Sequence, residues 1–205
     1  MIFNNQTKII FKIPNGTLFF EVFENHEIKI LSQIKTSILQ MPIAKVKINA
    51  KTNLIQKLSF LEKYFKIEIY SMNNNNEFLL FKGMIQKYTI ESDEQNSLCE
   101  LNIIGISEFI KLAFYIPINI KNINNQKTFE EMMNEFIIDC KIDGNINMPD
   151  NIDTRWQMSY SQKIPALAIV KNFVRINNLS IRFLLNGNAK IKNRQLLPPQ
   201  QTRFI

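Results

Sequence analysis

The chain has 205 residues, of which 45% are apolar and 21% charged, so it can bury a sizeable core and is neither disordered nor collagen-like. The formal net charge is +7, the single histidine excludes any site that needs two imidazoles, and two cysteines are too few for a disulfide scaffold. No apolar stretch is long enough to predict a membrane span, and the first ten residues lack the pattern of a secretory signal.

The chain opens with a predicted β-hairpin. Residues 8–13 and 17–23 are rich in β-branched and aromatic side chains, and the Pro14-Asn15-Gly16 turn signal separates them. The next segment, residues 27–40, fits neither the helical nor the strand period, so its structure stays open.

Strict alternation of apolar and polar residues then predicts further strands. It recurs in three segments: 44–49, 65–69 and 99–103. In the second of these, Lys66 and Glu68 are expected on the face opposite the apolar residues. Gly83, inside a long predicted strand at 77–90, indicates a bulge or a sharp bend. We therefore expect residues 1–110 to form an antiparallel, barrel-like β-domain.

From Ser107 the pattern becomes helical. Residues 107–114 predict a short helix, and Thr128-x-x-Glu131 is a capping box that opens a longer one. Its apolar stripe follows the spacing i, i+3, i+4, i+7 and i+8.

A further amphipathic helix is predicted over residues 164–176. The Asn186-Gly187 turn, of expected type I′, joins two strands at 180–185 and 188–192. Residues 111–205 are thus expected to form a smaller α+β part, which makes the fold class α+β.

Few residues suggest catalysis or metal binding. His26 lies between two β segments without a serine or cysteine motif, so it is interpreted as a surface turn residue. A pair of Cys140 with His26 is formally possible, but a buried thiol is the better interpretation of both Cys99 and Cys140. Four aspartates miss the spacing of a calcium loop and are interpreted as solvated: Asp139, Asp143, Asp150 and Asp153. No catalytic residue, metal site or cofactor is predicted.

The positive charge is concentrated in the last quarter of the chain. Residues 154–205 contain nine lysines and arginines and no acidic residue. Such a segment suits the phosphates of a nucleic acid or an acidic protein surface. No nucleic-acid-binding motif is present, so we favour the protein partner. The candidate interface residues are Arg155, Lys171, Arg175, Arg182, Lys190, Lys192 and Arg194.

The order of elements carries a family resemblance. It rests on Leu79–Ile85 with its Phe-x-Gly-x-Ile pattern, on Leu101–Ser107, on the helix near residues 166–174 and on the hairpin at 181–191. Over roughly residues 1–192 this series resembles the baseplate hub proteins of tailed phages (the late-control family) and the N-terminal part of type VI secretion spike proteins. The resemblance implies a ring-forming, usually trimeric hub that joins the tail tube to the central spike, without catalytic residues of its own.

These observations predict a structural protein of a phage tail baseplate hub or related injection machine. It would assemble in the bacterial cytoplasm, become part of the virion tail, form a homo-oligomer and contact the tube and spike proteins. Two alternatives stay open: a basic nucleic-acid-binding module, suggested by residues 154–205, and a cell-wall hydrolase, suggested only by the phage-like context.

Overall fold

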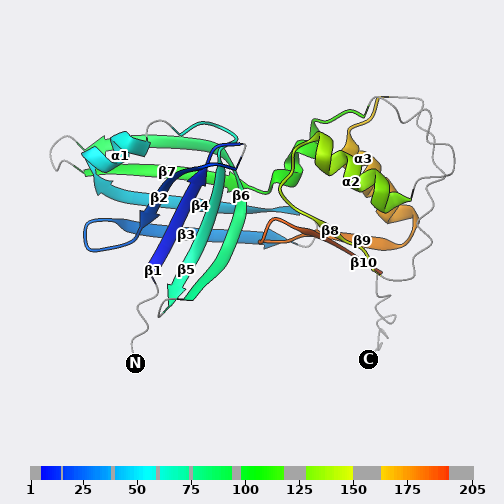
Figure 1. Cartoon of the computed structure of the whole chain (residues 1–205), viewed down its shortest axis with the longest axis horizontal. Helices are drawn as coiled ribbons and strands as arrows, with labels where there is room; N and C mark the ends of the chain where they lie inside the picture. Colours follow the sequence, from blue (N-terminus) through cyan, green and yellow to red (C-terminus); the bar gives the residue numbers. More distant parts are fainter. Residues whose placement is uncertain are drawn as a thin grey trace, which may run out of the picture.

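The computed structural model describes residues 6–14, 16–37, 40–58, 61–73, 76–93, 98–117, 128–149 and 163–193. They form two parts that lie side by side, a seven-stranded sheet with one short helix and a smaller part with two helices and three strands (Figure 1). Each part has its own hydrophobic core. The expected α+β class is confirmed.

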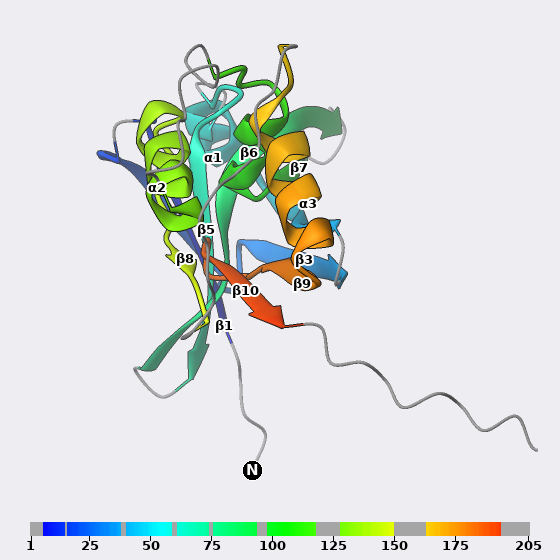
Figure 2. The same cartoon turned by 90° about the vertical axis from the view of Figure 1, so that its right-hand side faces the viewer.

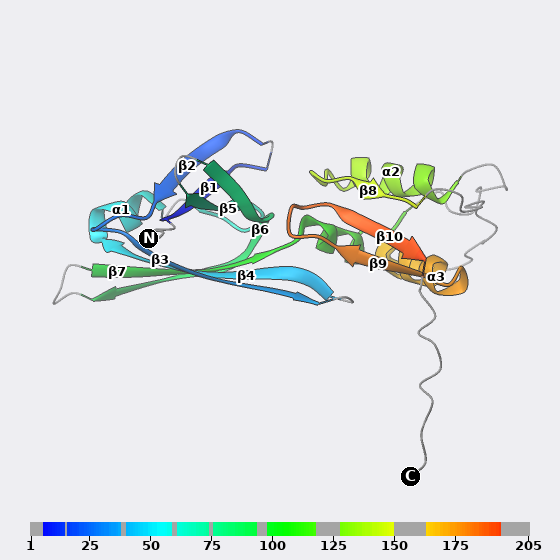
Figure 3. The same ribbon diagram turned by 90° about the horizontal axis from the view of Figure 1, so that it is seen from below.

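The first part is a single antiparallel sheet with the strand order β2-β1-β5-β6-β7-β4-β3. Its elements are β1 (Gln6–Lys12), β2 (Leu18–Phe23), β3 (Lys29–Ser37), β4 (Gln40–Lys51), α1 (Thr52–Leu58), β5 (Lys66–Asn73), β6 (Asn76–Asp93) and β7 (Leu98–Ile106). The sheet folds into two layers, with β1, β2 and β5 in one and β3, β4 and β7 in the other (Figure 3). In the described residues β2 and β3 remain edges, so the sheet curls but does not close.

The core between the two layers comes from the predicted alternation. Ala44, Val46 and Ile48 of β4 and Ile67 and Ile69 of β5 are buried. The opening hairpin is also confirmed, because β1 and β2 pair antiparallel. Residues 27–40, ambiguous in the sequence, supply the edge strand β3.

β6 changes layers near Gly83. Its first half pairs with β5 and its second half with β7, and Met84 is opposite both Lys66 and Ile106. A Cβ on Gly83 would lie 2.3 Å from the carbonyl oxygen of Ile106, so only glycine permits this close approach of the two strands. Register shifts lie on both sides of the glycine, which confirms the predicted irregularity.

The smaller part packs two helices on one face of a three-stranded sheet with the order β8-β10-β9 (Figure 2). Its elements are the 3₁₀ helix η1 (Glu108–Ala113), α2 (Phe129–Asp139), β8 (Ile146–Asn147), α3 (Ala166–Ile176), β9 (Leu179–Phe183) and β10 (Ala189–Asn193). The Thr128 capping box is present at the start of α2. Between the helices the Phe129 and Phe173 rings stack with centroids 3.8 Å apart.

The turn between β9 and β10 differs from the expected type I′. That type needs positive φ at both central residues, whereas of Asn186 and Gly187 only Gly187 has it. The Gly187 N–H instead donates to the carbonyl of Leu184. The Leu184 N–H also donates to the carbonyl of Asn188, and the three residues between them end on Gly187 with positive φ, which is the pattern of a three-residue hairpin loop with a left-handed glycine.

Candidate partner interface

Three candidate interface residues share the open face of the β9–β10 hairpin. Arg182 is directly opposite Lys190, and Lys192 follows two residues along the same strand face. All three are exposed, while Ile181 and Ile191 between them are buried beneath the helices. None of the three makes an ion pair with another described residue. Like charges opposite one another disfavour the isolated pair, so this face is suited to an acidic partner.

A second basic surface lies on α3. Lys171 and Arg175 are exposed one turn apart, on the helix side away from its buried residues. Because α3 covers the buried face of the small sheet, these two cations do not join those of the hairpin. The candidate residues therefore form two separate surfaces, and Arg155 and Arg194 lie outside the described residues.

A cluster of ion pairs connects the two parts of the molecule. Asp143 Oδ2 accepts hydrogen bonds from Lys66 Nζ at 3.2 Å and lies 3.0 Å from Lys82 Nζ. The Glu108 side chain, 4% exposed, is 4.0 Å from Lys66 Nζ and 2.8 Å from Lys111 Nζ. Asp143 lies in a loop and is exposed, as interpreted, but it pairs with two lysines that the sequence does not place beside it. We call these five residues the joint.

The pKa of Asp143 reflects this surrounding. Burial alone would raise the pKa, but the hydrogen bonds and charges of Lys82 and Lys66 outweigh it and hold the pKa below its usual value. The carboxylate is therefore charged above this lowered pKa, and it bridges β5 and β6 to the segment after α2.

Backbone contacts reinforce the joint. The Lys82 N–H donates to the carbonyl of Leu185 at 2.7 Å, so the tip of the β9–β10 hairpin docks on β6 (Figure 3). A Cβ on Gly144 would lie 2.1 Å from the carbonyl oxygen of Gly187. The hairpin that carries the basic face is thus held in a fixed position against the large sheet.

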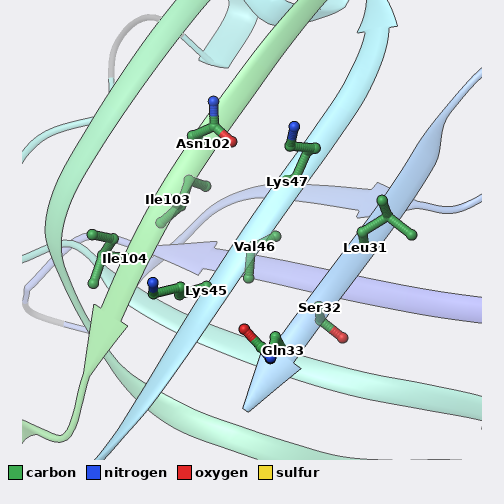
Figure 4. A pocket seen from close by; sticks show the side chains of 9 residues that line it. All are labelled: Leu31, Ser32, Gln33, Lys45, Val46, Lys47, Asn102, Ile103 and Ile104. Carbon is green, nitrogen blue, oxygen red and sulfur yellow. The ribbon is translucent and has the colours of Figure 1, made fainter. Parts of the chain in front are cut away.

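The outer face of β3, β4 and β7 carries a depression of about 390 Å³ (Figure 4). Its rim includes Leu31, which is 64% exposed, with Lys45 and Lys47 on the neighbouring strand. Among the described residues, its lining contains no carboxylate, thiol or imidazole.

The other reactive side chains lie apart from one another. His26 is exposed in the bend between β2 and β3, and the buried Cys99 contacts Thr52 in the large sheet. Cys140 ends α2 in the smaller part, where burial and Asp139 raise the pKa of its thiol to about 11. A thiol with a raised pKa is a poor nucleophile, and its histidine partner is in the other part.

Two further properties concern the described part of the chain. No group of three histidine, cysteine or acidic side chains there could hold a metal ion. None of its helices is long and apolar enough to cross a membrane.

The fold is that of tail proteins of prophages and of related secretion-system proteins. It is similar to the 43 kDa tail protein of prophage MuSo2 from Shewanella oneidensis, with a TM-score of 0.64 and 13% identity over 92% of this chain and 56% of that one. A tail protein from Neisseria meningitidis has a TM-score of 0.62 and 10% identity, over 95% of this chain and 53% of that one. An Escherichia coli component of the type VI secretion system has a TM-score of 0.53 and 13% identity, over 83% of this chain and 50% of that one.

The chain spans about half the length of these structures. No protein-family model and no curated protein matches the sequence.

Proposed function

We propose that the chain is a structural component of a phage tail baseplate hub, or of a related injection machine, which connects the tail tube to the central spike. The observation that carries the proposal is the shared fold, which extends over 92% and 95% of this chain in two tail proteins. The role is non-enzymatic and the location is the virion tail, after assembly in the bacterial cytoplasm.

The architecture supports a scaffold role. The two parts, which we propose as domains of residues 1–110 and 111–205, are held together by the joint and by the Lys82–Leu185 hydrogen bond. Two parts joined in this way can hold neighbouring proteins of a particle in a fixed relative orientation. The basic hairpin face and the α3 surface are the proposed contacts with acidic protein surfaces in the particle, and the family resemblance suggests a trimer.

The experiment is localisation in purified particles. A strain that lacks the gene is complemented with an epitope-tagged copy, and its tails are examined by immunogold electron microscopy. We expect label at the baseplate end and tails without baseplates in the uncomplemented strain. Particles that assemble normally without the protein and carry no label would refute the proposal.

The alternative of nucleic-acid binding is favoured by the three cations on the hairpin face, none of which pairs with another described residue. A gel shift with random duplex DNA at physiological salt separates the two functions, because phosphate contacts dominate non-specific binding. We expect weak binding. Tight binding that is lost when Arg182 and Lys190 are changed to glutamate would support the nucleic-acid function instead.

A further inference from the structure

All charged residues on the exposed face of α2 are acidic. Its charged residues are Glu130, Glu131, Glu135 and Asp139, and the helix contains no lysine or arginine. Ile138, 72% exposed, lies on this face, three residues after Glu135 and two helical turns after Glu131. The helix therefore presents an apolar side chain surrounded by negative charge.

The exposed face of α3 has the opposite character. Lys171 and Arg175 are exposed on a helix without any acidic residue, and neither makes an ion pair with a described residue. Ile176, next to Arg175, is 59% exposed. The two helices are each 11 residues long, and their exposed faces carry charge of opposite sign.

The two faces cannot meet within one molecule. The buried sides of α2 and α3 face each other, as the stacked rings of Phe129 and Phe173 show. Their exposed sides consequently point in opposite directions, with α2 on the left and α3 on the right of the smaller part in Figure 2.

We propose that the acidic face of α2 in one copy of this chain docks on the basic face of α3 in the next copy. Charge complementarity and the exposed isoleucine on each helix identify a second copy as the occupant. Because the contact joins two different surfaces, each copy offers one of each, and the association continues head to tail until it closes into a ring or forms a filament. The inference rests on the proposed function, because that function makes the chain part of an assembly. It adds that one neighbour in the assembly is a second copy of this chain.

The test is sedimentation velocity of the purified full chain with reversed charges. One variant carries Glu130→Lys and Glu135→Lys, a second carries Lys171→Glu and Arg175→Glu, and a third carries all four. We expect self-association to weaken about tenfold or more in each two-residue variant, since attraction becomes repulsion. The third variant, and an equal mixture of the first two, should regain association.

The matched control is Arg182→Glu with Lys190→Glu, which makes the same charge change as the second variant but on the hairpin face. It should associate like the unaltered chain, and thermal melting of all variants checks that they are folded. A chain that stays monomeric, two-residue variants that associate normally, or a control that is equally impaired would overturn the inference.

The outcome is separable from that of the proposed function. If purified tails are labelled but the variant with all four charge reversals does not regain self-association, the α2–α3 contact is rejected and the tail role is kept. If the variant with all four charge reversals regains self-association but the protein is absent from tails, the contact is supported and the tail role is rejected.

Discussion

At the scale of single residues, Lys66 and Glu68 illustrate how a correct strand pattern can predict the wrong environment. Both point away from the core between the layers, as the alternation predicts, yet both are buried. Lys66 is covered by the smaller part through Glu108 and Asp143, and Glu68 is 2.8 Å from Lys12 and accepts a hydrogen bond from Tyr70. Buried charges with partners hold two surfaces in one relative position, and losing a partner is costly.

The joint should be sensitive to loss of its central cation. Lys66→Met removes a partner from Asp143 and from the buried Glu108, and we expect the free energy of unfolding to fall by about 2 kcal/mol. Urea denaturation measures the change. Lys45→Met, at an exposed position without an ion pair among the described residues, is the control and should have little effect. Equal stability of both variants would show that the joint contributes nothing.

The joint should also make stability depend on pH. The pKa of Asp143 is lowered in the folded protein from its ordinary value of 3.8, so its contribution is present above that value and is lost as the pH falls through the lowered pKa. Asp143→Asn removes this contribution. Its urea midpoint should therefore decline less than that of the unaltered protein on acidification through this range. Parallel declines would contradict the assignment.

At the scale of elements, local sequence patterns located most strands and helices, and the exceptions share one cause. The capping box and apolar stripe of α2 and the alternation of β4 and β7 are local signals, and all three elements are confirmed. The sequence analysis missed α1 and the two-residue strand β8, because each is too short to show a period. β8 exists through its parallel pairing with β10, which is a tertiary contact.

A buried charge tests which side chains of β5 and β7 point into the core. Ile67→Asp or Leu101→Asp places a carboxylate where the side chain is 0% exposed, which should cost about 4 kcal/mol and unfold the large sheet. Leu31→Asp, on the exposed outer face of β3, is the matched control and should fold normally. The melting temperature of the three variants is measured by circular dichroism. An unchanged melting temperature for Ile67→Asp would mean that this strand face is not the buried one.

At the scale of the whole molecule, the charge asymmetry of the sequence becomes a distribution of surfaces. Five of the nine cations of the last quarter are divided between the hairpin and α3, and α2 supplies an acidic face in the same part. Like-charged faces repel themselves only weakly in salt, so such surfaces are tolerated in a folded chain and become useful in an assembly.

The surfaces should matter for assembly and little for folding. Reversal of Lys171, Arg175 and Arg182 to glutamate should leave the melting temperature nearly unchanged, since all three are exposed, but should slow or abolish incorporation into particles. Quantitative blotting of purified tails measures incorporation. The control reverses Lys29, Lys45 and Lys87, three exposed lysines of the large sheet, and should incorporate normally. Normal incorporation of the first variant would reject the contact role of these residues.

The sequence by itself determined the α+β class, the antiparallel strands, the two amphipathic helices and the concentration of positive charge, because each depends on side chains that are neighbours along the chain. Only the tertiary structure decided that the sheet curls without closing, that the tip of the β9–β10 hairpin docks on β6, and that Lys66 and Asp143 are partners. Those properties depend on residues far apart in sequence, and Lys66 and Asp143 are 77 positions apart. The same reason separates the basic residues into two surfaces: composition counts charges, whereas the packing of α3 on the small sheet determines which of them point in the same direction.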